Sequence, residues 1–282
     1  MKSGFKAFVS MLADIRRVFS LRLTGSVRIG VLKTYLSTFV LKRYDARNRL
    51  ARIMGYRVKF CTYGALSWLF KEIFLNHQYC FMTSKVRPFV IDCGSNIGMS
   101  ILYFKTLYPD SEILAFEPDE AAFSCLEVNV KANKLHRVEI NRKAISNREG
   151  QTDFYYDEAS PGSLSMSTRF ERMPKQKRQV DATILSKYIV RDVDFLKIDV
   201  EGAEQSIIEE LRTAGKLSHI HQMVIEYHHH IVKDEDLFSK LLEVLEESGF
   251  GYQIEGSVGR PLQEQVFQDL LVYAYRKPCS AS

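Results

Sequence analysis

Few cysteines and no long apolar run are present in this sequence of 282 residues. The five cysteines are scattered, and no two form a C-x-x-C pair: Cys61, Cys80, Cys93, Cys125 and Cys279. This pattern argues against a zinc site or a disulfide framework and is typical of a reducing compartment. A run of about 18 apolar residues, the length that indicates a membrane-spanning helix, is also missing. The sequence therefore predicts no spanning helix.

A cleavable signal peptide is not recognisable either. The first residues contain no uninterrupted apolar core followed by a small-residue cleavage site. Internal repeats and low-complexity tracts are likewise missing. With 46% apolar and 26% charged residues, the composition is that of an ordinary globular protein. We therefore expect a cytoplasmic protein with one large domain and an appendage, or with two domains.

The net charge of +5 is unevenly distributed along the chain. Residues 1–52 contain twelve Lys or Arg and two Asp, a net charge of +10, so the remaining 230 residues carry about −5. Two interpretations stay open. The basic segment is a solvated helical extension packed on the rest of the chain, or it lies on an acidic membrane surface through stretches such as "FKAFVSML" and "VLKTYLSTFVLKRY". No recognition helix or RNA-binding signature accompanies the charge, so we expect no nucleic-acid partner.

Two regions of the chain differ in their hydrophobic periodicity. Residues 1–85 are expected to be mainly helical, because apolar residues in "LSWLFKEIFLNHQYCF" recur at three- and four-residue steps. From about residue 87 onwards, predicted strands alternate with predicted helices. The strands are expected at 87–94, 111–118, 137–146, 193–200, 221–228, 252–256 and 269–277, and the helices at 97–109, 119–134, 203–215 and 234–249. The polar, turn-rich residues 157–180 are expected to form a loop or hairpin near the site.

The alternation of strands and helices indicates an α/β domain over residues 86–278, preceded by the basic, mainly helical extension at 1–85. Near-continuous apolar strands predict a mostly parallel sheet with helices on both faces. Ligands of such sheets bind beyond the carboxyl ends of the strands, where the strand order reverses. Five residues of catalytic or binding type fall at that edge: Asp92, Gly94, Glu117, Asp199 and Glu226.

The turn "DCGSNIG" after the first strand of this domain indicates a cofactor site. Gly94 and Gly98 permit a tight turn beside a helix N-terminus, and Glu117 is placed to accept the hydroxyls of a ribose. A dinucleotide would bring a pyrophosphate next to Asp92, which would repel it, whereas S-adenosylmethionine brings a sulfonium and an ammonium group. The spacing is also G-x-x-x-G rather than G-x-G-x-x-G. We therefore expect S-adenosylmethionine, with a nicotinamide-dependent oxidoreductase as the alternative.

Several segments together resemble the FkbM family of S-adenosylmethionine-dependent methyltransferases. They are "VIDCGSNIGMS", "LAFEPDEAAFSCLEVNV", "AIS" with Gly150, "DFLKIDVEGAE" and "IEYH", in this order between about residues 65 and 275. The resemblance implies a class I methyltransferase fold, which is a Rossmann-like sheet of seven strands with one antiparallel strand. It also implies methylation of a hydroxyl oxygen, on a sugar or a polyketide-like molecule.

The resemblance also assigns residues to the cofactor. Carried over by position, the methionine part would be held by Asp92, Gly94, Asn96 and Gly98. Glu117 would bind the ribose, and the adenine would lie near Ala144, Ile145 and Ser146. One departure is "VDATILSKYI", where Ser186 and Lys187 replace the acidic residues that the family often has. That turn therefore has no predicted role.

Four side chains at the ends of two strands are candidates for the acceptor side. Lys197 and Asp199 share one face of their strand, and Glu226 and His228 share one face of theirs. If these two strands lie beside the strand that precedes the "DCGSNIG" turn, Asp199 can also reach the methionine amine. Glu201 then lies with these four side chains at the same edge of the sheet. Asp199 and Glu226 then lie together above the sheet.

A hydroxyl acceptor needs a base or a metal to remove its proton, and two mechanisms fit these residues. In the favoured mechanism, His228 is the general base and Glu226 or Asp199 holds its tautomer. In the other, Asp199, Glu226 and His228 bind a hard divalent ion. The alternative without catalysis is a salt-bridged network around Lys197, and a membrane-surface binding module is a further alternative for the whole protein.

Two more residues have an open interpretation. Glu204 lies in the first turn of a predicted helix, where a carboxylate complements the helix dipole, and we expect that role rather than catalysis. Tyr79 is expected either to close over the cofactor or to pack in the core.

Overall fold

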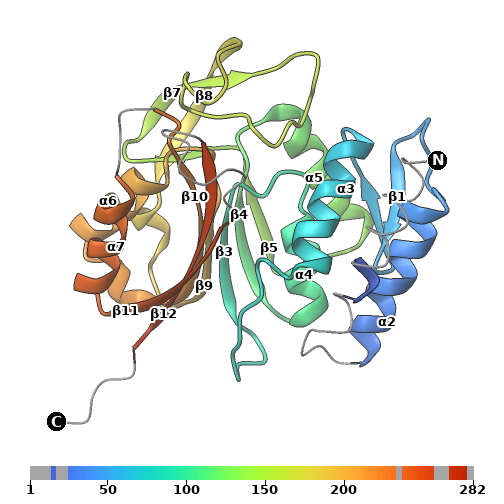
Figure 1. The fold of residues 1–282 in the computed structure, drawn as a ribbon, viewed down its shortest axis with the longest axis horizontal. Coiled ribbons are helices and arrows are strands. Elements are labelled where there is room, and N and C mark those ends of the chain that lie inside the picture. Colours follow the sequence, from blue (N-terminus) through green and yellow to red (C-terminus); the bar gives the residue numbers. More distant parts are fainter. Residues whose placement is uncertain (1–13, 17–24, 233–236, 257–266, 278–282) are drawn as a thin grey trace.

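The computed structural model describes residues 14–16, 25–232, 237–256 and 267–277 (Figure 1). At its centre is a sheet of seven strands in the order β11-β12-β10-β9-β3-β4-β5. The strands are β3 (Phe89–Cys93), β4 (Glu112–Phe116), β5 (Val138–Asn141), β9 (Val193–Ile198), β10 (Ile220–His229), β11 (Phe250–Gly256) and β12 (Gln268–Arg276). Among the described strands of this sheet, β12 runs antiparallel to the other six. The predicted mostly parallel, seven-stranded sheet is thereby confirmed.

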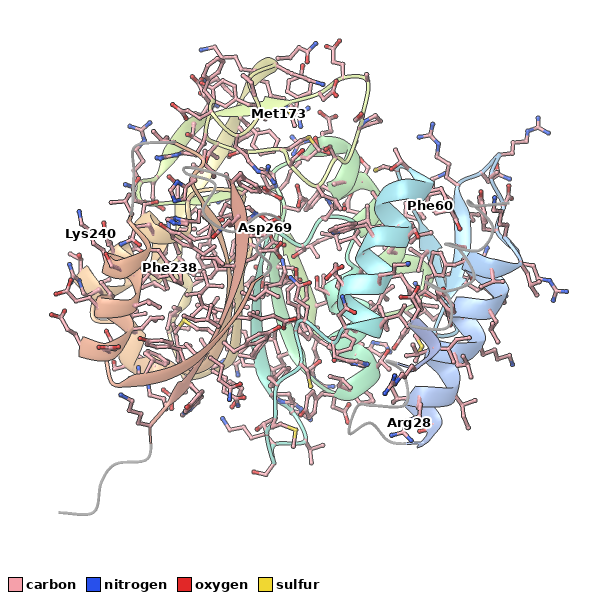
Figure 2. All side chains as sticks on the ribbon, viewed as in Figure 1. Arg28, Phe60, Met173, Phe238, Lys240 and Asp269 are labelled. Carbon is pink, nitrogen blue, oxygen red and sulfur yellow. The ribbon has the colours of Figure 1, made fainter. Side chains whose placement is uncertain are left out.

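Helices cover both faces of this sheet (Figure 1), and side chains fill the space between the helices and the sheet (Figure 2). On one face lie α4 (Met99–Leu107) and α5 (Glu120–Ala132), and on the other lie α6 (Glu204–Thr213) and α7 (Phe238–Glu247). Every residue of β9 is buried, with Phe195 in the core cluster of the first face and Leu196 in that of the second. A strand buried along its whole length is what a sheet covered on both sides requires. Because β9 pairs with β3 and β10, the ends of these three strands meet at one edge.

A second, smaller sheet lies above that edge, and the prediction missed it. The strand expected over 137–146 is broken: β5 ends at Asn141, the chain turns, and β6 (Ala144–Ser146) joins another sheet. This sheet has the order β6-β8-β7, with β7 (Gly150–Tyr156) and β8 (Gln176–Ile184). No glycine or proline occurs at the turn formed by residues 142–143. The sequence therefore contains no indication that the strand ends there. Of the residues 157–180 that were expected to form a loop or hairpin, 157–175 connect β7 to β8 and 176–180 begin β8.

The N-terminal region is helical only in part. Its helices are α2 (Gly25–Thr34), the π-helix η1 (Tyr35–Val40), α3 (Tyr63–Phe70) and the π-helix η2 (Lys71–Leu75). Between them, β1 (Leu50–Ile53) and β2 (Tyr56–Lys59) form a hairpin that the helical prediction missed. Its two-residue turn has positive φ at both Met54 and Gly55, a geometry that favours hairpins.

The N-terminal elements are packed on the rest of the protein. The side chain of Asn129 in α5 accepts a hydrogen bond from the Lys59 amide at 2.6 Å and donates to the Lys59 carbonyl at 2.9 Å. Apolar residues of α2, α3 and β2 belong to the same core cluster as those of α4. None of the described helices has the length and hydropathy needed to cross a bilayer.

Candidate active site

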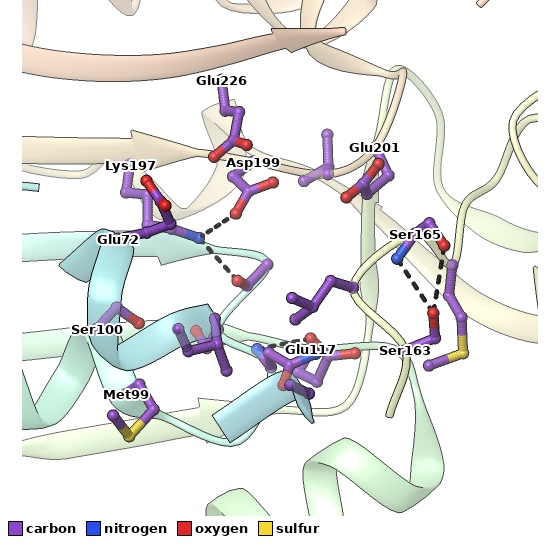
Figure 3. A pocket seen from close by; sticks show the side chains of 18 of the residues that line it. Glu72, Met99, Ser100, Glu117, Ser163, Ser165, Lys197, Asp199, Glu201 and Glu226 are labelled. Carbon is purple, nitrogen blue, oxygen red and sulfur yellow. Dashed lines mark hydrogen bonds and ion pairs between the residues drawn. The ribbon is translucent and has the colours of Figure 1, made fainter. Parts of the chain in front are cut away.

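A cavity of about 850 Å³ lies at the carboxyl ends of the central strands (Figure 3). Its walls come from the turn after β3, the ends of β4, β9 and β10, the helix α3, and the chain between β7 and β8. In Figure 3 the carboxylates of Asp199, Glu201 and Glu226 lie on one side of the cavity, and Glu117 lies on the opposite side. The volume is large enough for a cofactor together with part of an acceptor.

The turn after β3 depends on its two glycines. Gly94 has φ +84°, and a Cβ atom there would lie 1.8 Å from the carbonyl oxygen of Asp199. Gly98 has φ +87°, and its Cβ would lie 2.7 Å from the side chain of Leu126. At Gly94 both the backbone conformation and the Asp199 carbonyl exclude a side chain, and at Gly98 the positive φ disfavours one. Gly94 and Asn96 line the cavity, whereas Gly98 lies outside its lining, in contrast to its expected place beside the cofactor.

Asp92 occupies a different place from the one expected. Its side chain is fully buried beneath the turn and does not line the cavity. Ser100 Oγ donates to its Oδ2 at 2.5 Å, and Lys197 Nζ lies 3.3 Å from its Oδ1. The carboxylate is thus paired with an internal lysine and lies outside the lining of the cavity, whereas the sequence predicted it beside the cofactor.

Lys197 holds several parts of the site together. Its Nζ donates to the Gly94 carbonyl at 2.7 Å and lies 3.2 Å from Asp199 Oδ2, with the Tyr79 ring 5.0 Å away. Burial opposes its charge, but the attraction of Asp199 and Asp92 outweighs burial and raises the pKa of Lys197. A permanent cation in this strand therefore balances two carboxylates and fixes the glycine turn.

Glu117 directly follows β4 and faces the cavity, with a hydrogen bond to each carboxylate oxygen. Its Oε1 accepts from the Asp119 amide and its Oε2 from the Asn96 amide, each at 2.8 Å. Asn96 adopts φ +47°, which turns its amide towards the carboxylate. Burial raises the pKa of Glu117 to about 8. Beside it, β6 contributes two buried apolar residues to the wall, Ala144 and Ile145.

Asp199 and Glu226 form a carboxylate pair on the other wall. Tyr79 Oη donates to Asp199 Oδ2 at 3.1 Å and lies 3.4 Å from Glu226 Oε2. Gln78 Nε2 donates to the same oxygen of Glu226 at 2.7 Å. Burial and the charge of Asp199 raise the pKa of Glu226 to about 8. Tyr79 is therefore a buried donor that holds the two carboxylates.

His228 lies next to this pair, but the expected partner was wrong. Its Nδ1 lies 2.9 Å from Glu204 Oε1, and neither Glu226 nor Asp199 holds the ring. On the other side, Nε2 lies 3.1 Å from Glu201 Oε2. Burial disfavours the charged ring, but the two glutamates outweigh burial and raise the pKa of His228 well above its usual value. A protonated imidazole has no lone pair with which to act as a base.

Glu204 has a larger role than the expected dipole interaction. Its side chain is buried, and Oε1 also accepts from the Gly202 amide at 2.8 Å. This carboxylate lies inside the sharp turn between β9 and α6, directly below β10. The sequence indicated only that Glu204 lies in the first turn of a helix. That position does not predict that the turn between β9 and α6 brings Glu204 close to His228.

The chain between β7 and β8 is attached to the site through Glu201. The Ser167 hydroxyl donates to the Glu201 carbonyl, and Arg172 Nε lies 2.6 Å from Glu201 Oε2. Glu201 itself has φ +59°. The sequence contained no motif that indicated Ser167 or Arg172. Their role depends on a contact with Glu201, which lies about 30 residues further along the chain.

Comparison with known proteins agrees with the geometry. Residues 92–252 match the methyltransferase FkbM domain. Methyltransferase 1 of Beauveria bassiana is 28% identical over 211 residues, which is 67% of this chain and 83% of that protein. The 31-O-demethyl-FK506 methyltransferase FkbM of Streptomyces tacrolimicus is 25% identical over 209 residues, 62% of this chain and 79% of that protein. The 2-O-methyltransferase NoeI of Sinorhizobium fredii is 28% identical over 152 residues, 48% of this chain and 61% of that protein.

A crystal structure of a methyltransferase FkbM from Methylobacillus flagellatus is similar with a TM-score of 0.46 and 15% identity, over 96% of this chain and 60% of that chain. The matching domain covers more than half of the sequence and contains the glycine turn, Glu117 and the Asp199–Glu226 pair. The chain therefore belongs to the FkbM methyltransferase family.

Proposed function

We propose that this methyltransferase uses S-adenosylmethionine and transfers its methyl group to a hydroxyl oxygen of a small molecule or glycan. One observation carries the proposal: a single cavity joins Glu117 and the glycine turn to the carboxylate pair Asp199 and Glu226. The first wall suits an adenosine cofactor, and the second suits a hydroxyl acceptor. Two relatives named as O-methyltransferases support the acceptor class.

The cofactor is assigned to the wall that contains the glycine turn. Each oxygen of Glu117 accepts one amide hydrogen bond and keeps capacity to accept a ribose hydroxyl. Ala144 and Ile145 offer an apolar surface to the adenine, and the main chain of Gly94 and Asn96 borders the methionine part, while Gly98 supports the turn from outside the cavity lining. Asp199 offsets the positive charge of that part, while Asp92 acts indirectly by holding Lys197.

The proton of the acceptor hydroxyl is assigned to Glu226. Methyl transfer forms a carbon–oxygen bond, breaks the carbon–sulfur bond and releases S-adenosylhomocysteine, so the hydroxyl proton must leave. Glu226 lines the cavity, and a pKa near 8 suits a base that works close to neutral pH. His228 is then a positioning residue, a charged ring that holds Glu201 and Glu204 in place, in contrast to the base role expected from the sequence.

A metal-assisted mechanism has one specific observation in its favour. Ligand atoms of Asp199, Glu226 and His228 all lie within 4.8 Å of one another. Two carboxylates and an imidazole are a donor set that a divalent ion can use, but His228 would have to lose its Nε2 proton and its contact with Glu201 to become a ligand. Such an ion would lower the pKa of the acceptor hydroxyl.

The proposal is tested with methyl-labelled S-adenosylmethionine and a panel of sugars, lipid-linked glycans and polyketide alcohols. We expect label in an ether linkage on one acceptor class and equimolar S-adenosylhomocysteine. Transfer that EDTA abolishes and magnesium restores would favour the metal mechanism over Glu226. No transfer to any acceptor, with NAD-dependent oxidation of the same alcohols, would identify an oxidoreductase instead.

The proposed location is the cytoplasm. The scattered cysteines, among which no C-x-x-C pair occurs, support it, because their pattern does not indicate a disulfide framework.

A further inference from the structure

One helical surface of the N-terminal region is apolar on its outer side. In α2 and η1, exposed residues recur at three- and four-residue steps, which places them on one face of the helix. Ile29 is 67% exposed, Leu36 38% and Val40 39%, and Leu41, which directly follows η1, is 59% exposed. We call this surface, together with the basic residues beside it, the outer face: Ile29, Lys33, Leu36, Val40, Leu41, Lys42 and Arg43.

The inner side of the same helix already has its core contacts. Val31, Tyr35 and Thr38 are buried, and Tyr35 Oη donates to Asp14 Oδ2 at 2.8 Å. The apolar residues of the outer face are therefore not needed to attach the helix. In Figure 1, α2 forms the outermost layer of the molecule on the side away from α6 and α7.

The segment that contains the outer face carries almost only positive charges. Residues 25–60 contain nine Lys or Arg and one acidic residue, Asp45. Residues 1–24 add five Lys or Arg and one Asp to the sequence, and the segment "FKAFVSML" among them lies outside the described residues. Two copies of such a face repel each other, so self-association is disfavoured.

This combination fits an anionic lipid bilayer. Apolar side chains on one helical face enter the boundary between headgroups and acyl chains, and adjacent Lys and Arg bind anionic headgroups. Nucleic acid fits less well, because Ile29, Leu36 and Val40 would lie against phosphates without a hydrogen-bonding role. We propose that the outer face docks the protein peripherally on an anionic bilayer.

Docking would place the cavity close to the bilayer surface. Phe39 of η1 stacks on Phe70 of α3 with ring centroids 4.5 Å apart. Helix α3 lines the cavity through Ala65 and Trp68, and Trp68 is 59% exposed. The outer face is therefore one helix away from the cavity, yet none of its residues lines the cavity. Docking and catalysis are thus separable in experiments.

The test is vesicle sedimentation of the full chain. We expect binding to vesicles of phosphatidylcholine mixed with phosphatidylglycerol, little binding to phosphatidylcholine alone, and weaker binding as salt rises. The triple variant Ile29→Ser, Leu36→Ser and Leu41→Ser removes apolar contact without changing charge, and its partition constant should fall roughly tenfold or more. The pair Lys42→Gln and Arg43→Gln should give a similar loss.

Val190→Ser is the matched control. Val190 is 83% exposed but lies outside both the outer face and the cavity, so its binding should equal that of the parent. Parent-like binding by the triple variant, or no binding to either vesicle, would overturn the proposal. So would binding of a DNA duplex that the Lys42 and Arg43 substitutions weaken while vesicles are not bound.

Discussion

At the scale of single residues, the site is a balance of buried charges. Lys197 lies between Asp92 and Asp199, and its contact with Asp199 is visible in Figure 3. His228 lies in the same way between Glu201 and Glu204. Buried charges persist only when they are paired, so each cation stabilises the carboxylates that would otherwise be too costly to bury.

Removing the central cation should be more damaging than removing the whole pair. Lys197→Met leaves Asp92 buried without a counter-charge, and the free energy of unfolding should fall by about 3–5 kcal/mol. The double variant Asp92→Asn with Lys197→Met should recover part of this loss. Urea unfolding measures both, and equal losses for the single and double variants would contradict the charge balance.

The assignment of the base to Glu226 predicts a selective loss of rate. Glu226→Gln keeps the size of the side chain but cannot accept the proton, so kcat should fall by roughly 10²–10⁴ with nearly unchanged S-adenosylhomocysteine affinity. The control is Glu72→Gln, which also changes a cavity-lining glutamate but one bonded to Asn76. Parent-like kcat in Glu226→Gln, or an equal loss in Glu72→Gln, would reject the assignment.

The same assignment fixes the sign of the pH dependence. Glu226 must be deprotonated to act, and burial together with Asp199 raises its pKa to about 8. The value of kcat/KM should therefore rise with pH and level off above about 8. The Glu226→Gln variant should not show this rise of kcat/KM with pH. If the rise persists in the variant, the ionisation belongs to another group.

At the scale of elements, the glycine turn after β3 connects the cofactor wall to the acceptor wall. The Gly94 amide donates to Phe116 at the end of β4, and its missing side chain lets the Asp199 backbone pass. One short turn thus sets the relative positions of β3, β4 and β9.

A methyl group at this turn should therefore disrupt the fold. Gly94→Ala combines positive φ with a backbone clash, so the free energy of unfolding should fall by more than about 2 kcal/mol. Gly64→Ala, in helix α3 with no atom within 4 Å of the new Cβ, should leave stability unchanged or raise it by about 0.5–1 kcal/mol. Thermal unfolding compares the two, and similar effects would contradict the structural role of Gly94.

Helices and strands with a clear hydrophobic periodicity were predictable from the sequence. Elements that depend on pairing between segments were not. The strands β3, β4, β9 and β10 and the helices α4 and α5 follow from apolar runs and helical spacing. The break between β5 and β6 has no turn residue, and the β1–β2 hairpin lies in a segment with helical neighbours. The Glu204–His228 contact depends on a turn that brings β10 above α6, and residue spacing carries no such information.

At the scale of the whole molecule, three layers meet at one cavity. The parallel sheet presents its strand ends, the β6–β8–β7 sheet supplies Ala144 and Ile145, and the N-terminal helix α3 closes the side. The outer face is on the far side of that helical layer. The protein therefore combines a methyltransferase site with a separate basic surface.

The most direct test of this account is calorimetric titration of the parent and of Glu117→Ala with S-adenosylhomocysteine and with NAD. We expect the parent to bind S-adenosylhomocysteine and not NAD, and Glu117→Ala to bind it roughly tenfold or more weakly, because two ribose hydrogen bonds are lost. Tight binding of NAD without a response to S-adenosylhomocysteine would contradict the proposed cofactor.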